Sequence, residues 1–105
     1  MAAPYFSLII PAHNEENRLP DTLQQVTAYL HAQPYNFEVL VVENSSTDQT
    51  YSIAQAFASQ HPQVRVLQNA QRGKGRAVKQ GMLEACGEYR FMCDADLSMP
   101  VAEIS

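Results

Sequence analysis

Two aspartates, Asp94 and Asp96, are the residues of this sequence whose type and spacing most directly suggest chemistry. They follow a short apolar run, Tyr89 to Cys93, which is typical of a buried β-strand. Because side chains alternate in direction along an extended backbone, both carboxylates should project to the same side. Mg²⁺ and Mn²⁺ favour one or two carboxylates together with the oxygens of a bound phosphate. The pair therefore predicts a metal site for a phosphate ester, although an aspartate after a strand can also be the N-cap of a helix.

The elements that would position this pair alternate regularly along the chain. Short β-rich apolar segments are separated by stretches with helical periodicity, among them an apolar stripe from Leu19 to Leu30. We expect strands at 5–10, 37–42, 64–67 and 89–93. We expect helices at about 20–31, from Asp48 to Pro62, and at about 75–86, the last through Val78, Met82 and Cys86.

This alternation predicts an α/β fold with a Rossmann-like parallel sheet and helices on both faces. Right-handed crossovers that move outward from the first strand and then return to its other side give the strand order 3-2-1-4. Ligands of such sheets bind beyond the carboxyl ends of the strands, at the point where the order reverses. The polar segments 11–16, 43–48 and 94–98 each follow a predicted strand and should converge on that crevice.

Composition narrows the choice of function. With 105 residues the chain is at most a single domain, and its net charge of −4 argues against general attraction to nucleic acid. A basic cluster between Arg72 and Lys79 is the exception, but Lys74 is followed by glycine, which excludes a Walker-type phosphate loop. Cys86 and Cys93 are expected to be reduced core residues. Without a signal peptide or a membrane span, the chain is interpreted as cytoplasmic.

Four segments together resemble the motifs of family 2 glycosyltransferases of the GT-A fold. The similarity extends from about Ser7 to Ser105 and is strongest to enzymes that transfer sugars to dolichyl or other polyprenyl phosphates. In order, the four segments are Pro11-Ala12-His13-Asn14-Glu15-Glu16, Glu43-Asn44-Ser45-Ser46-Thr47-Asp48, Arg72-Gly73-Lys74-Gly75 and Asp94-Ala95-Asp96-Leu97-Ser98.

The resemblance implies a role for each matching residue. Glu43 corresponds to an acidic residue that accepts a hydrogen bond from the nucleotide base. His13 stands where the family usually has tyrosine, and it is expected to have a structural or stacking role rather than to act as an acid or base. Asp94 and Asp96 correspond to the Asp-x-Asp motif, which would hold the metal ion and take part in catalysis. The nucleotide-binding residues implied in this way are Pro11, Ala12, His13, Asn14, Glu15, Glu43, Ser45, Lys74, Asp94 and Ala95.

The expected function is therefore metal-dependent, inverting transfer of a hexose from a UDP- or GDP-sugar to an acceptor, with Mg²⁺ or Mn²⁺ as the cofactor. A polyprenyl phosphate is the favoured acceptor and a glycan the other. The family usually has Asp-Asp-Gly-Ser after the second strand, so Glu43-Asn44-Ser45-Ser46 leaves the base preference open. Members of the family are about twice as long or more, which suggests an N-terminal fragment whose acceptor-binding and membrane-attaching parts lie downstream, at the cytoplasmic face of the membrane.

Three other interpretations remain. A nucleotidyltransferase would usually carry a glycine-rich basic loop after the first strand, where this chain has Pro11 to Glu15. A flavodoxin-like interaction domain would use the aspartates as an acidic pocket without a substrate. A fragment that binds sugar nucleotides without catalysing transfer would keep the site and lack the acceptor half.

Overall fold

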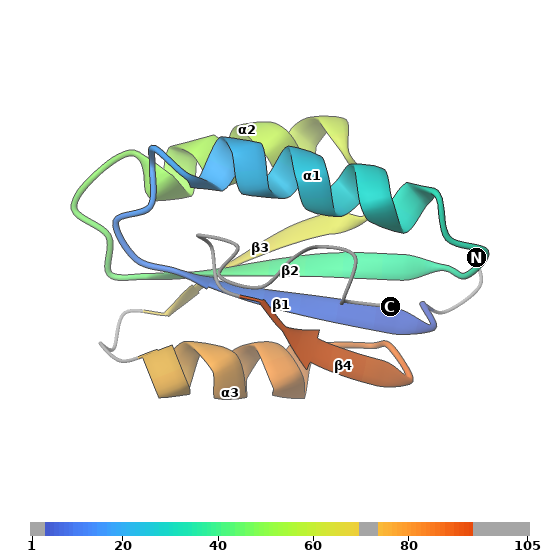
Figure 1. Ribbon diagram of the computed structural model, residues 1–105. Helices are drawn as coiled ribbons and strands as arrows, with labels where there is room; N and C mark the ends of the chain where they lie inside the picture. The colour runs from blue at the N-terminus through green and yellow to red at the C-terminus, as the bar shows by residue number, and fades with distance from the viewer. Residues whose placement is uncertain (1–3, 70–73, 94–105) are drawn as a thin grey trace.

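The structure is a computed structural model that describes residues 4–69 and 74–93, in which strands and helices alternate strictly (Figure 1). The elements in chain order are β1 (Phe6–Ala12), α1 (Leu19–His31), β2 (Phe37–Asn44), α2 (Thr50–Gln60), β3 (Val64–Asn69), α3 (Lys74–Glu84) and β4 (Tyr89–Met92). The strands pair in parallel in the order β3-β2-β1-β4. Helices α1 and α2 cover one face of the sheet and α3 covers the other. The predicted fold and strand order are confirmed.

The strand order also excludes one of the alternatives. In the flavodoxin-like order 2-1-3-4-5, β1 would lie between β2 and β3. Here β1 lies between β2 and β4 instead. The switch point is therefore between β1 and β4, as the sequence predicted, and the flavodoxin-like interpretation is wrong.

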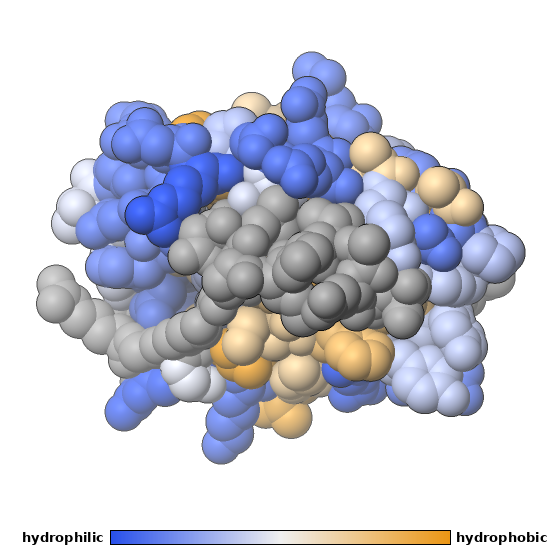
Figure 2. Space-filling model, in the orientation of Figure 1, coloured by the Kyte–Doolittle hydropathy of each residue, from blue (hydrophilic) through white to orange (hydrophobic). Residues whose placement is uncertain are grey.

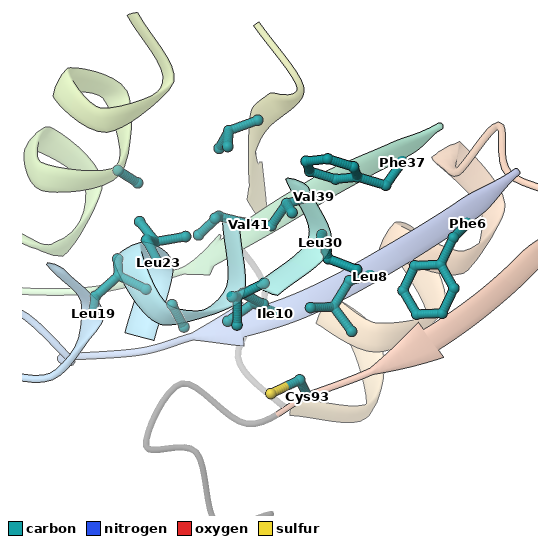
Figure 3. Close-up of a cluster of buried hydrophobic side chains, with 14 residues drawn as sticks. Phe6, Leu8, Ile10, Leu19, Leu23, Leu30, Phe37, Val39, Val41 and Cys93 are labelled. Atoms are coloured by element: carbon teal, nitrogen blue, oxygen red, sulfur yellow. The ribbon is translucent and has the colours of Figure 1, made fainter. Parts of the chain in front are cut away.

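The two central strands form the core because both of their faces are covered. Every residue of β1 and β2 is buried, which explains their continuous apolar sequences. On the α1 and α2 side, Leu8 and Ile10 pack with Val39 and Val41 (Figure 3). The predicted stripe of α1 closes this cluster, since Leu19, Leu23, Val26 and Leu30 are all fully buried.

Helix α3 packs on the sheet differently from the prediction. Its buried face carries Ala77 and Gly81, and Ala85 directly after the helix is buried as well, whereas Val78 and Met82 are only partly buried and Cys86 is exposed. A Cβ atom on Gly81 would lie 2.4 Å from Cγ2 of Ile9, so only glycine allows this approach. The expectation of a core Cys86 is thus wrong, because small residues rather than large apolar ones bring α3 onto the sheet. Cys93 is buried, as predicted.

Strands β1 and β2 are two residues longer at their carboxyl ends than predicted. Pro11 therefore lies in β1 and Glu43 in β2, instead of in the following loops. The main-chain groups of alternate residues of β1 face β4, and the carbonyl of Ile9 accepts the N–H of Cys93 there (2.9 Å). Pro11, two residues further on, faces the same side, where a residue without an N–H is tolerated. The described pairing of β1 with β4 ends at Ile9, so Pro11 lies beyond it.

Strand β4 forms an edge of the sheet within the described residues. Its side chains are exposed, with Tyr89 at 49% and Phe91 at 48%, although Phe91 stacks on Phe6 at 5.2 Å between ring centroids. Figure 2 shows hydrophobic side chains below the centre of the view, on the side of the molecule where Figure 1 places α3 and β4. The edge position follows from the predicted strand order, whereas the expectation that the strand itself is buried is wrong.

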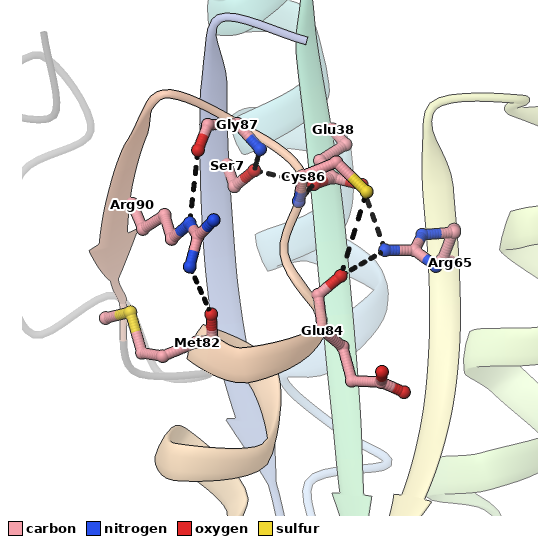
Figure 4. Close-up of polar contacts among 8 residues, drawn as sticks. All are labelled: Ser7, Glu38, Arg65, Met82, Glu84, Cys86, Gly87 and Arg90. Atoms are coloured by element: carbon pink, nitrogen blue, oxygen red, sulfur yellow. Dashed lines mark hydrogen bonds and ion pairs between the residues drawn. The ribbon is translucent and has the colours of Figure 1, made fainter. Parts of the chain in front are cut away.

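At the opposite end of the sheet from the predicted site, a buried carboxylate anchors α3 (Figure 4). Oε2 of Glu38 accepts hydrogen bonds from the hydroxyl of Ser7 and from the N–H of Cys86, both at 2.6 Å. Its Oε1 lies 3.2 Å from the guanidinium of Arg65, which also donates to the carbonyl of Glu84 at the end of α3 (3.0 Å). The N–H of Gly87 donates to the Ser7 hydroxyl (2.8 Å). Anchoring the last turn in this way directs the first turn of α3 toward the carboxyl edge of the sheet.

None of the helices in residues 4–69 and 74–93 is long and apolar enough to cross a membrane.

Candidate functional site

The carboxyl ends of the four strands form one edge, and their order along it is set by the sheet. Gln68 and Asn69 end β3, Glu43 and Asn44 end β2, and Ala12 ends β1. At β4 the last described residue is Cys93. The predicted Asp94, Ala95 and Asp96 follow it in the chain but lie outside the described residues, as do Arg72 and the side chain of Lys74. Their roles stay predictions.

Two loops at this edge are joined to each other by hydrogen bonds. The loop after β1 donates the N–H of Asn14 to the hydroxyl of Ser46 (3.0 Å), and Oδ1 of Asn14 accepts the N–H of Thr47 (2.8 Å). The N–H of Glu15 donates to Oγ1 of Thr50 (2.8 Å). These bonds bring the first two predicted motifs together as a single surface, and Figure 2 shows hydrophilic side chains gathered there, at the upper left.

The backbone turns sharply in both loops. Asn14 has φ of 53° and Ser45 has φ of 49°, in the left-handed region that favours glycine. Asparagine is among the residues that tolerate this region, and here its side chain bonds across to Thr47. Ser45 stands where the resembled family has glycine, so this chain keeps the backbone turn without the residue that makes it easiest.

His13 is fixed in orientation by both of its ring nitrogens. Nδ1 lies against the carbonyl of Asn44, which can only accept, so Nδ1 carries a proton. Nε2 then accepts from the side-chain amide of Asn14 at 3.4 Å. His13 is exposed to solvent.

Glu43 is a buried carboxylate, 4% exposed, at the end of β2. Its Oε2 accepts the N–H of Ser46 and its Oε1 accepts the side-chain amide of Gln68 (3.3 Å). Register pairs Glu43 with Gln68 across the β2–β3 ladder. Sequence reasoning missed Gln68, because the predicted order places β3 beside β2 but does not give the register that pairs these two side chains.

The other predicted residues have mainly structural positions in the loops. Pro11 and Ala12 are buried in β1, and Ala12 belongs to the core. Glu15 lies directly before the turn that leads into α1, where its carbonyl accepts the N–H groups of Arg18 and Leu19, and its carboxylate lies 3.6 Å from the Arg18 guanidinium. These residues shape the loop on which His13 and Asn14 are presented.

The Asp48 carboxylate joins the second loop to the first through hydrogen bonds, and its protonation should make the stability of the fold depend on pH. Its carboxylate accepts the N–H (2.9 Å) and the hydroxyl of Thr50 and the N–H of Glu16 (3.3 Å). Desolvation raises the pKa of Asp48, but the bonds from Thr50 and then from Glu16 outweigh it, so this pKa lies below its ordinary value.

A lowered pKa in the folded state means that Asp48 stabilises the fold above its unfolded pKa of about 3.9 and loses that effect as the pH falls through the folded value. We therefore expect the difference in unfolding free energy between wild type and Asp48→Asn to be constant from about pH 7 to 5 and to shrink below about pH 4. Urea unfolding across this range measures it. A difference that grows with acidity would contradict the role of Asp48.

No group of three or more histidine, cysteine, aspartate or glutamate side chains suited to a metal occurs in the described part of the chain. The predicted donors, Asp94 and Asp96, supply carboxylate oxygens, and this type of ligand fits Mg²⁺ or Mn²⁺ better than softer metals.

A parallel sheet with its polar loops at the carboxyl edge defines a class of α/β proteins that bind ligands at a switch point. Within it, the family model for glycosyl transferase family 2 matches residues 7–105. This chain belongs to glycosyltransferase family 2.

Curated relatives agree with this assignment. The chain is 42% identical over 98 residues to a dolichyl-phosphate beta-glucosyltransferase of Drosophila melanogaster, covering 86% of this chain and 30% of that protein. It is 33% identical over 102 residues to an undecaprenyl-phosphate 4-deoxy-4-formamido-L-arabinose transferase of Pseudomonas fluorescens, covering 95% and 30%. The chain thus spans about 30% of the length of these relatives.

Solved structures share the fold. The mannosyltransferase PcManGT of Pyrobaculum calidifontis, in complex with GDP-Man and Mn²⁺, matches with a TM-score of 0.70 and 28% identity, over 91% of this chain and 28% of that one. Residues 1–349 of TarS from S. aureus match with a TM-score of 0.72 and 30% identity, over 88% and 27%. The fold expected for the nucleotide-binding half of a GT-A enzyme is confirmed.

Proposed function

We propose that this chain binds a nucleoside diphosphate hexose as the donor half of a metal-dependent, inverting transferase whose acceptor is a polyprenyl phosphate. The observation that carries the proposal is the pair of loops joined through Asn14, Ser46 and Thr47 at the carboxyl edge of the sheet. Relatives named for transfer to dolichyl and undecaprenyl phosphates favour the acceptor. Structures with bound UDP and GDP-Man favour the donor.

In this proposal His13 and Glu43 bind the nucleotide base. His13, with both ring nitrogens engaged, offers a flat face on which a base can stack. Glu43 accepts an N–H of the base with a lone pair left over from its bonds to Ser46 and Gln68. Neighbouring strands are about 4.8 Å apart, so the ends of β3 and β4 are separated by roughly 14 Å, which suits an extended nucleoside diphosphate.

The diphosphate would lie at the β4 end of this edge, next to Asp94 and Asp96. A divalent cation held there would neutralise the charge that develops on the departing diphosphate. A phosphate acceptor is largely ionised near neutral pH, so its oxygen can attack the anomeric carbon without a protein base. Attack from the face opposite the leaving group inverts the configuration. We place the reaction at the cytoplasmic face of a membrane, with membrane contact through segments downstream of these 105 residues.

Calorimetry with UDP and GDP, each with and without Mn²⁺, tests donor binding. We expect binding of one or both that requires Mn²⁺, because the cation bridges the carboxylates and the diphosphate. UMP, which has no β-phosphate, is the control and should gain little from Mn²⁺. Equal binding with and without metal would contradict the proposed site.

A second candidate is sugar-nucleotide binding without transfer, since the two joined loops described above are assigned to the donor alone. Incubation of the chain with radiolabelled UDP-glucose, Mn²⁺ and dolichyl phosphate separates the two. Radiolabelled lipid establishes transfer, whereas metal-dependent binding without labelled lipid establishes the second candidate.

A further inference from the structure

We infer that Gln68 reads the nucleotide base together with Glu43, and that this pair selects bases with an N–H next to a carbonyl. The inference rests on the proposed function and names the class of base at that site. It concerns the end of β3, to which neither the motifs nor the comparisons assign a role.

The contact between the two side chains is direct. Nε2 of Gln68 donates to Oε1 of Glu43 at 3.3 Å, and the two residues are register partners on neighbouring strands. Glu43 is 4% exposed, whereas Gln68 is exposed to solvent. Gln68 is therefore the solvent-side member of the pair and the first to meet a ligand that approaches the end of β3.

Within the described part of the chain, the hydrogen bonds of this pair leave one donor and one acceptor side by side. The amide nitrogen of Gln68 has two N–H groups, and one of them is used by Glu43. Oε1 of Glu43 has two lone pairs, and one of them is used by Gln68. The second N–H and the second lone pair can both serve the same ligand edge.

The orientation of Glu43 is fixed from the other side as well. Its Oε2 accepts the N–H of Ser46, and the hydroxyl of Ser46 accepts the N–H of Asn14. The carboxylate therefore cannot rotate freely to suit another pattern. A fixed donor and acceptor pair discriminates between bases more strongly than a mobile one, because a mismatch leaves polar groups unpaired.

An acceptor beside a donor is complementary to a lactam edge. Uracil has N3–H beside O4 and guanine has N1–H beside O6, and each can donate to Glu43 while accepting from Gln68. Cytosine and adenine carry these two functions in the opposite order, a bare ring nitrogen beside an amino group. In the same orientation of the base, the ring nitrogen would face Glu43 with a second acceptor and the amino group would face Gln68 with a second donor. The pair thus favours uridine and guanosine nucleotides over cytidine and adenosine nucleotides.

The test is a calorimetric panel of UDP, GDP, CDP and ADP at one Mn²⁺ concentration, with wild type and Gln68→Met. Methionine keeps the length of the side chain and removes the donor. We expect UDP and GDP to lose about threefold to tenfold in affinity, the usual value of one hydrogen bond, while CDP and ADP change less than about twofold. The selectivity for UDP over CDP should fall by the same factor.

Gln80→Met is the matched control, because within residues 4–69 and 74–93 the Gln80 amide donates to the main-chain carbonyl of Gln68, at 3.5 Å, and not to its side chain. Gln80→Met should leave the affinities for all four nucleotides unchanged, and both variants should have the melting temperature of the wild type. An equal loss for all four nucleotides, or tighter UDP binding by Gln68→Met, would overturn the inference. A wild type that binds all four equally defeats this inference alone, whereas a wild type that binds none defeats the proposed function with it.

Discussion

Replacing Asp96 with asparagine is expected to weaken Mn²⁺-dependent UDP binding by about 100-fold or more. The substitution keeps the shape of the side chain and removes one negative charge from the predicted pair of oxygen donors. Hard divalent cations depend on carboxylate charge, and a bound metal contributes several kcal/mol to stabilising diphosphate charge. A loss of about 2.7 kcal/mol corresponds to this factor, since each 1.36 kcal/mol is tenfold. Calorimetric titration of UDP at saturating Mn²⁺ measures it.

The control for this substitution is Asp21→Asn. Asp21 is an exposed carboxylate in the first turn of α1, where it accepts a hydrogen bond from Gln25 at 2.7 Å. The control removes the same charge from the protein at an exposed position of α1 that the proposed site does not use. If both variants weaken UDP binding equally, the effect is one of net charge and the prediction for Asp96 is wrong.

Glu38→Ala is expected to lower the free energy of unfolding by about 3 to 5 kcal/mol. Glu38 is 7% exposed and joins β2 to Ser7 of β1, to the end of α3 and to Arg65 of β3. Its removal leaves the hydroxyl of Ser7 and the N–H of Cys86 without their acceptor, and unpaired buried groups carry their full desolvation cost. Urea unfolding followed by circular dichroism measures the change.

Glu38→Gln separates the charge from the hydrogen bonds at this position. Glutamine can present its oxygen to Ser7 and Cys86, but its amide then faces the Arg65 guanidinium, donor against donor. We expect a smaller loss than for alanine. Glu88→Ala, an exposed carboxylate on the turn before β4, should cost less than about 0.5 kcal/mol. Equal losses for Glu38→Gln and Glu38→Ala would show that the bonds to Oε2 contribute nothing.

Local patterns were sufficient for most of the fold. The periodicity of Leu19, Leu23, Val26 and Leu30 predicted the buried face of α1, because a helix repeats its facing residues within a few positions. Continuous apolar runs predicted central parallel strands, and the alternation of elements with right-handed crossovers predicted their order. The same reasoning failed for α3, where the buried positions are Ala77, Gly81 and, directly after the helix, Ala85. Small residues carry little hydrophobic signal, and only the close approach of the sheet makes them core.

The sequence by itself also determined that polar segments would follow the strands, and that His13, Asn14 and Glu43 would meet at one edge. The tertiary structure decided how they meet: through Ser46 and Thr47 across two loops, and through Gln68 from a third strand. Likewise, nothing in the order of residues joins Ser7, Glu38 and Cys86. The periodicity of apolar residues is a property of neighbours along the chain. The pairing of buried polar groups depends instead on strand register and on how the helices pack on the sheet, which exist only after folding.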